Sequence, residues 1–136
     1  MINKTYADHA WEQAAALLAI DSPSGFTAKA AAWVKETFES YGFSASVTTK
    51  GGVLIDLGGK DENNAIMLAA HTDTLGGMVA EIKGNGCLRV TPLGGMRAEN
   101  SETENVRVYT RGGAVIEGTC QLHNPSIHVN GGYGDT

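Results

Sequence analysis

The feature that most restricts the fold is the run AIMLAA at residues 65–70, in which every side chain is apolar. A strand with one face in solvent alternates apolar and polar residues, so an uninterrupted apolar run is typical of a strand covered on both faces. Strands of this kind lie at the centre of the sheets of α/β proteins. We therefore predict that residues 65–70 form a central strand of an α/β domain.

Two segments before this run carry the spacing of amphipathic helices. Over residues 6–20 apolar side chains recur at i, i+3, i+4 and i+7, and the segment DSPSG then interrupts the pattern. A second helix is predicted from about residue 25 to 41, with Ser24 or Thr27 as its cap and Gly42 as its C-terminal stop. The shorter periods that follow predict strands at residues 43–49 and 53–57.

The second half of the chain lacks a helical stripe and is divided by glycine-containing turns. Short strands at this spacing indicate a small all-β module, either a barrel or a sandwich. The expected organisation is an incomplete α/β domain over residues 1–75 and a β-rich domain over residues 76–136. The strands predicted in the second domain cover residues 77–83, 87–91, 105–110, 114–120 and 126–130.

Composition excludes several function classes. Ten basic and fifteen acidic residues give a net charge of −5 without a basic stripe, so a nucleic-acid partner is not expected. No apolar run is long enough to span a membrane, and the N-terminal residues lack the layout of a signal peptide. Cys87 and Cys120 lie outside any CxxC spacing. We therefore predict a cytoplasmic protein with no membrane partner.

The apolar run leads into the stretch AAHTDTLGGMV, residues 69–79, which contains His71 and Asp73. Ligands and catalytic groups collect at the carboxyl ends of strands in open α/β sheets. Residues i and i+2 of an extended chain point to the same face, so the carboxylate can approach the imidazole. A metal-bound histidine usually donates its second ring N–H to such an acceptor. The spacing alone leaves two interpretations open, a metal ligand with its orienting carboxylate or a local hydrogen bond.

The other candidate groups offer less. A catalytic zinc ion needs about three protein ligands, and His9, His123 and His128 have no carboxylate at ligand spacing beside them. We expect His9 to face solvent, and the other two histidines to point to opposite faces of a strand. The glycine pairs do not form a phosphate-binding loop, and the SPSG segment lacks the GxSxG pattern of a nucleophile elbow.

The order of several short motifs resembles the glutamyl or tetrahedral aminopeptidases, family forty-two of the metallopeptidases, whose members have often been described as endoglucanases or cellulases. The resemblance runs along essentially the whole chain. Each motif is short, but their succession is specific. The matching stretches are IDSPSG at residues 20–25, AAHTD at 69–73, GMV at 77–79 with Ile82, GNG at 84–86 with Leu88, LGG at 93–95, GTCQ at 118–121 and PSIHVN at 125–130.

This resemblance implies an α/β metallo-aminopeptidase catalytic domain interrupted, after the HxD segment, by a small β-barrel-like domain used in oligomer assembly. It also implies hydrolysis of N-terminal residues from peptides by two divalent metal ions, zinc or cobalt, with a glutamate as general base. In this interpretation His71 is the first metal ligand. Asp73 is the catalytic-site carboxylate that orients it.

The family's bridging aspartate, general-base glutamate and remaining ligands are expected after the inserted domain, beyond Thr136. We therefore expect an N-terminal fragment with an incomplete inserted domain, inactive alone and with weak or no metal affinity. The expected partners are a peptide substrate of the complete enzyme and a second copy of the chain, bound through the β-rich domain.

Two alternatives remain open at this point. The related aminoacylase, deacetylase and tripeptidase group also contains HTDT and SPSG-like segments. In that group a glycine-rich metal-binding turn containing an aspartate normally follows, whereas residues 75–82 here are predicted to lead directly into β structure. The other alternative is a non-catalytic oligomerisation module beginning near residue 76, in which His71 has no catalytic role.

Overall fold

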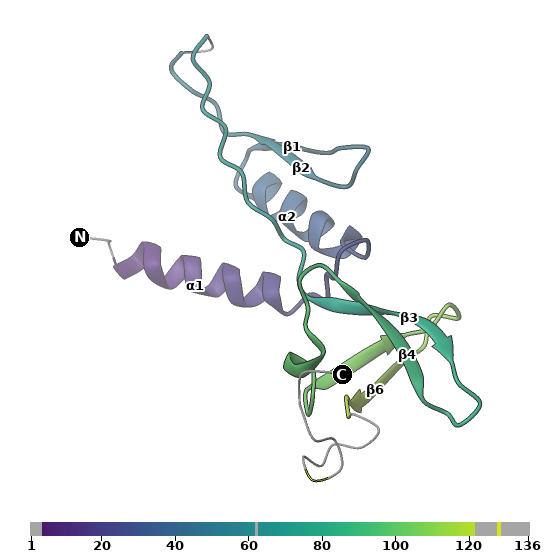
Figure 1. Ribbon diagram of the computed structural model, residues 1–136. Coiled ribbons are helices and arrows are strands. Elements are labelled where there is room, and N and C mark those ends of the chain that lie inside the picture. The colour runs from purple at the N-terminus through teal and green to yellow at the C-terminus, as the bar shows by residue number, and fades with distance from the viewer. Residues whose placement is uncertain (1–3, 62, 122–127, 129–136) are drawn as a thin grey trace. The chain divides into compact units, whose positions relative to one another are not determined.

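The computed structural model describes residues 4–61, 63–121 and 128 (Figure 1). The chain divides into two compact units, Met1–Leu75 and Gly76–Thr136. The first contains two helices and a β-hairpin, and the second contains two further hairpins. The fold is therefore a mixture of α and β structure with small antiparallel sheets. The assignment of these units to a catalytic and an inserted domain stays a prediction.

The two predicted helices are present as α1, Lys4–Leu18, and α2, Ala28–Ser40. The apolar stripe of α1 is not buried: Trp11 is 76% exposed and Leu18 is 70% exposed. Amphipathic spacing is sufficient to specify a helix, but it does not supply the surface that would cover the helix. Among the described residues, the buried apolar core consists of Ala30 and Ala31 on α2.

The C-terminal end of α2 forms as its glycine predicts. Gly42 has a φ of 89°, and its N–H donates to the carbonyl of Glu39, while the N–H of Phe43 donates to the carbonyl of Phe38. This pair of bonds is the Schellman arrangement, which satisfies carbonyls that the end of a helix leaves unpaired. The ring centroids of Phe38 and Phe43 lie 6.3 Å apart, and the two rings provide the apolar contact that often accompanies a Schellman motif. Thr27 occupies the N-cap position of α2 without a side-chain capping bond.

A β-hairpin packs on α2 (Figure 1). Its strands are β1, Ser44–Val47, and β2, Val53–Asp56, paired antiparallel with Val47 opposite Val53. Both strands lie within the predicted ranges. Both strands of the hairpin contact α2.

The predicted central strand at residues 65–70 is wrong. No arrow is drawn there in Figure 1, and no described residue bonds to the main chain of this segment. Ile66, Met67 and Leu68 are 88%, 83% and 84% exposed. A central strand takes its hydrogen bonds and the cover of both faces from other elements. The hairpin that precedes this run in the sequence, β1 with β2, and the hairpin that follows it, β3 with β4, each form a two-stranded sheet of their own.

The second unit contains β3, Gly76–Ile82, paired with β4, Leu88–Leu93, and β5, Asn105–Tyr109, paired with β6, Val115–Thr119. A single 3-10 turn, Ala98–Asn100, separates the hairpins. The pairing register shifts between Val79 and Glu81, which marks a β-bulge. Beyond it, the side chains of Glu81 and Arg89 form a cross-strand ion pair at 2.9 Å.

The four strands of the second unit were predicted, but their assembly into a barrel or sandwich is not present in the described residues. The two hairpins form separate two-stranded sheets. The predicted strand at residues 126–130 lies outside the described part of the chain except for His128, which is in a turn. The inserted barrel therefore remains a prediction.

Candidate functional site

The site begins with a tight turn at residues 23–26, directly before α2. The N–H of Phe26 donates to the carbonyl of Pro23 at 2.8 Å. Gly25, the third residue of this turn, has a φ of 87°, a conformation that glycine adopts without the steric cost of a side chain. The Ser24 hydroxyl in this turn donates a hydrogen bond to a part of the first unit that is distant in the sequence.

The main chain ties this turn to the residues that follow the apolar run. The N–H of Thr74 donates to the carbonyl of Ser22 at 2.8 Å, and Pro23 and Thr74 form an isolated parallel bridge. The Ser24 hydroxyl donates to Oδ2 of Asp73 at 2.6 Å. The bridge, which includes the Thr74–Ser22 bond, and the Ser24–Asp73 bond thus bring Asp73 against a segment that is 49 residues distant from it in the sequence.

The imidazole of His71 lies against the same carboxylate. Its Nδ1 is 3.0 Å from Oδ1 of Asp73 and 3.1 Å from the main-chain oxygen of Asp73. Both partners are acceptors, so Nδ1 is the protonated ring nitrogen in this arrangement. In the neutral ring Nε2 then carries the lone pair. The His71 side chain is 85% exposed, and Nε2 is the nitrogen that can bind a metal ion.

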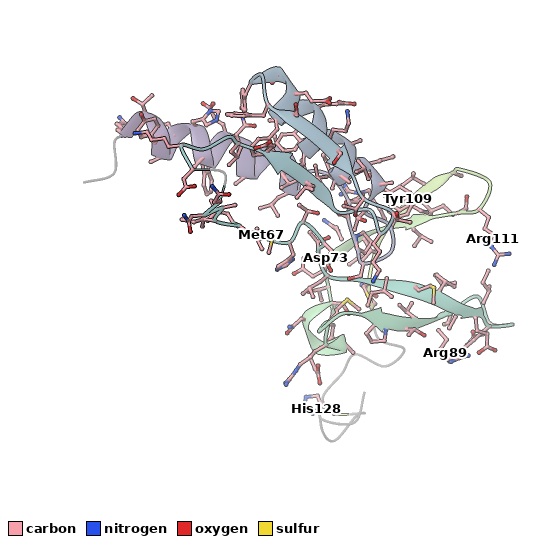
Figure 2. The ribbon with its side chains drawn as sticks, turned by 90° about the horizontal axis from the view of Figure 1, so that it is seen from above. Met67, Asp73, Arg89, Tyr109, Arg111 and His128 are labelled. Atoms are coloured by element: carbon pink, nitrogen blue, oxygen red, sulfur yellow. The ribbon has the colours of Figure 1, made fainter. Side chains whose placement is uncertain are left out.

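The predicted approach of His71 and Asp73 is therefore present, but not at the end of a strand. Both residues lie in an irregular segment between the apolar run and β3, where Figure 2 labels Asp73 and, earlier on the same trace, Met67. The bridge between Pro23 and Thr74 holds the segment in place of a sheet. The roles assigned to the two side chains stay predictions.

The surroundings of Asp73 favour its ionised form. The hydrogen bond from Ser24 is the main cause that lowers the pKa of the Asp73 carboxyl, and the charge and hydrogen bond of His71 lower this pKa further. Partial desolvation opposes these effects. A hydrogen bond donated to a carboxylate stabilises its charged form, so Asp73 is an acceptor for His71 at neutral pH.

One ligand does not make a metal centre. In the described ranges, no group of three or more His, Cys, Asp or Glu side chains is arranged to hold an ion. His9 contacts Tyr41 through a 3.4 Å hydrogen bond, His128 lies in a turn, and His123 lies outside the described residues. Residues of this chain thus fit the role of one ligand and its orienting carboxylate.

The contact between Ser24 and Asp73 was not predicted from the sequence. The sequence offers Ser24 as a candidate cap of the second helix, but Thr27 occupies the N-cap position and the Ser24 hydroxyl binds Asp73 instead. The only local signal was the PSG turn, which fixes the direction of the Ser24 side chain. No spacing rule identifies its partner 49 residues away.

The described helices include none that is long and apolar enough to cross a membrane. Comparison with known proteins identifies relatives. A model of the M42 glutamyl aminopeptidase family matches residues 51–135. Across 113 residues the chain is 35% identical to YhfE of Bacillus subtilis (strain 168), which is provisionally named an aminopeptidase; this covers 83% of the chain and 33% of YhfE.

Two further relatives carry aminopeptidase names. The glutamyl aminopeptidase of Lactococcus lactis subsp. cremoris (strain MG1363) is 33% identical over 107 residues, which cover 78% of this chain and 30% of that protein. The lysyl aminopeptidase of Pyrococcus furiosus (strain ATCC 43587 / DSM 3638 / JCM 8422 / Vc1) is 42% identical over 48 residues, 35% of this chain and 14% of that protein. The chain spans about a third of the length of the first two relatives.

The family resemblance predicted from the succession of short motifs is confirmed by these matches. The family model covers well over half of the chain and includes both His71 and Asp73. The chain belongs to the M42 glutamyl aminopeptidase family.

Proposed function

We propose that the chain forms the N-terminal part of a metal-dependent aminopeptidase that removes N-terminal residues from peptides in the cytoplasm. The observation that carries this proposal is the geometry of His71: Asp73 holds its Nδ1, its Nε2 has no partner among the described residues, and its side chain is exposed. A carboxylate bound to the second nitrogen fixes the tautomer and raises the basicity of a histidine ligand. The aminopeptidase names of the relatives support the reaction class.

In the complete enzyme two divalent metal ions, zinc or cobalt, would polarise the scissile carbonyl and activate water. His71 would provide one ligand through Nε2. Asp73 would hold the proton on Nδ1 and stabilise the orientation of the ring. The remaining ligands and the general base would come from polypeptide that this chain does not include, since the chain spans about a third of its relatives.

The isolated chain would then bind a metal ion weakly and would have no peptidase activity. The test is hydrolysis of glutamyl, lysyl and alanyl p-nitroanilides by the purified chain, with and without zinc or cobalt. Calorimetry measures metal affinity in parallel, and His71→Ala is the matched variant. We expect no hydrolysis and weak binding that His71→Ala abolishes. Metal-dependent hydrolysis by the isolated chain, or zinc binding unaffected by His71→Ala, would contradict the proposal.

A second role is favoured by the surface of the 76–136 unit. Apolar side chains of β3 and β4 are exposed, including Met78 at 56% and Ile82 at 75%. Exposed apolar groups on neighbouring strands are typical of surfaces that bind another protein. We propose that this unit, predicted to be a barrel-like inserted domain, mediates self-association. Light scattering of the unmodified chain and of an Ile82→Asp variant tests this: a monomer in both cases would contradict it.

A further inference from the structure

The two oxygens of the Asp73 carboxylate have different partners. Oδ1 accepts from His71 Nδ1 at 3.0 Å, and Oδ2 accepts from the Ser24 hydroxyl at 2.6 Å. We infer that Ser24 is a positioning residue, which fixes the Asp73 carboxylate and through it the Nδ1–H tautomer of His71. The metal-related consequence of this inference rests on the proposed function, but the contact between Ser24 and Asp73 does not.

Asp73 needs a second anchor because its surroundings constrain it little. Its side chain is 42% exposed, and its other partner, His71, is itself 85% exposed and only two residues away. Two exposed side chains on one irregular segment can rotate together without losing their mutual contact. The Ser24 hydroxyl comes from a different segment, so it fixes the carboxylate relative to the first unit.

The segment that carries Ser24 is itself held. The Phe26–Pro23 bond closes the turn, and the Thr74–Ser22 bond and the bridge of Pro23 with Thr74 attach it to the chain beside Asp73. A hydroxyl that donates to a carboxylate at this distance forms a charge-assisted bond, which is stronger than one between neutral groups. Ser24 is therefore placed by the backbone and bound through the stronger class of hydrogen bond.

The neighbouring Ser22 provides a matched control. It lies in the same segment and is 1% exposed, but its hydroxyl has no hydrogen-bond partner among the described residues. Removing its hydroxyl changes the same chemical group two positions away without touching Asp73. A positioning role belongs to Ser24 alone, so the two alanine variants must differ.

The experiment is nitrogen-15 NMR of the His71 ring in the unmodified chain and in Ser24→Ala, Ser24→Thr and Ser22→Ala. Ring nitrogen shifts report the ratio of the Nδ1–H to the Nε2–H tautomer. We expect Nδ1–H to dominate in the unmodified chain, in Ser24→Thr and in Ser22→Ala. In Ser24→Ala we expect the ratio of Nδ1–H to Nε2–H to fall by roughly threefold to tenfold, because a partly exposed hydrogen bond to a charged acceptor is lost.

An unchanged ratio in a folded Ser24→Ala variant overturns the inference, as does an equal fall in Ser22→Ala. Circular dichroism shows whether each variant is folded. Where Ser24→Ala does not fold, Ser24→Cys replaces it, because the thiol keeps the shape but is a weak donor. The same fall in the ratio of Nδ1–H to Nε2–H is then expected in Ser24→Cys, and an unchanged ratio in that variant would contradict the inference.

A zinc titration of the same samples separates this inference from the proposed function. Zinc that perturbs Nε2 of His71, with a tautomer ratio unaffected by Ser24→Ala, supports the metal ligand and overturns the positioning role. A tautomer ratio that responds to Ser24→Ala, without any perturbation by zinc, supports the positioning role and contradicts the proposed weak zinc binding by His71 in the isolated chain.

Discussion

The main-chain N–H of Thr74 lies 2.8 Å from the carbonyl oxygen of Ser22. This bond joins the segment before the PSG turn to the residue after Asp73 through main-chain atoms alone, so the side chains of Ser24, His71 and Asp73 take no part in it. Substitutions of Ser24, His71 and Asp73 can therefore be compared on a common backbone.

The Asp73 carboxylate is expected to titrate below the usual aspartate range. Its folded-state pKa is lowered, chiefly by the Ser24 hydrogen bond and then by His71. A group whose pKa is lowered on folding contributes stability above its unfolded pKa, and this contribution is lost as the pH falls through the lower folded value. The contacts of Asp73 should thus persist at neutral pH and weaken as the pH falls below the ordinary aspartate range.

Carbon-13 NMR of the Asp73 carboxyl measures this titration. The midpoint should rise toward the ordinary aspartate value in Ser24→Ala, because the main cause of the shift is removed. The Ser22→Ala variant should titrate like the unmodified chain. A midpoint that is the same in Ser24→Ala and in the unmodified chain would contradict the prediction.

Ser22→Ala should leave the free energy of unfolding unchanged or raise it by up to about 1 kcal/mol. The hydroxyl of Ser22 is buried without a partner in the described structure, so the substitution removes a polar group that has lost its contact with water. Guanidinium denaturation measures the effect. A loss of more than about 1 kcal/mol would indicate that this hydroxyl makes a stabilising bond.

Gly42→Ala should destabilise the first unit by about 1–2 kcal/mol, because a side chain disfavours the left-handed conformation that this residue adopts at the end of α2. Gly59→Ala is the control, since Gly59 has no positive φ and an added Cβ would meet nothing within 4 Å. Thermal unfolding monitored by helical circular dichroism compares the two. Equal melting temperatures would exclude a special role for Gly42.

Gly77→Ala should weaken the pairing of β3 with β4 by about 1–3 kcal/mol. An added Cβ would clash with Cγ1 of Val90, and a β-branched side chain has little freedom to move away. Gly84→Ala is the control, because open space surrounds that position. Amide exchange of β3 and β4 should accelerate in Gly77→Ala and stay unchanged in Gly84→Ala; the same rates in both would refute the clash.

Sequence patterns predicted the elements that local interactions determine. The helices follow from apolar periodicity, the end of α2 from Gly42, and the hairpins from alternating residues between glycine-containing turns. Each of these depends on residues that are close in the sequence. The proximity of His71 and Asp73 belongs to the same class, since it requires only an extended chain of three residues.

Patterns that depend on distant partners were predicted less well. The apolar run at residues 65–70 has the composition of a central strand, but composition does not provide the neighbours that such a strand needs. The bond from Ser24 to Asp73 was missed for the opposite reason. The contact exists, but nothing in the sequence around either residue identifies the other as its partner. The order of motifs along the chain was more informative than any one spacing, and it identified the family.

The exposed run at residues 65–70 has a consequence for handling the isolated chain. Ile66, Met67 and Leu68 are apolar and almost fully exposed, and no described residue binds their main-chain groups. Short apolar segments with free backbone donors and acceptors associate edge to edge and start aggregation. A charged substitution at Met67 should therefore raise the solubility limit of this chain, and the same change should be harmful wherever the run is buried in a complete sheet.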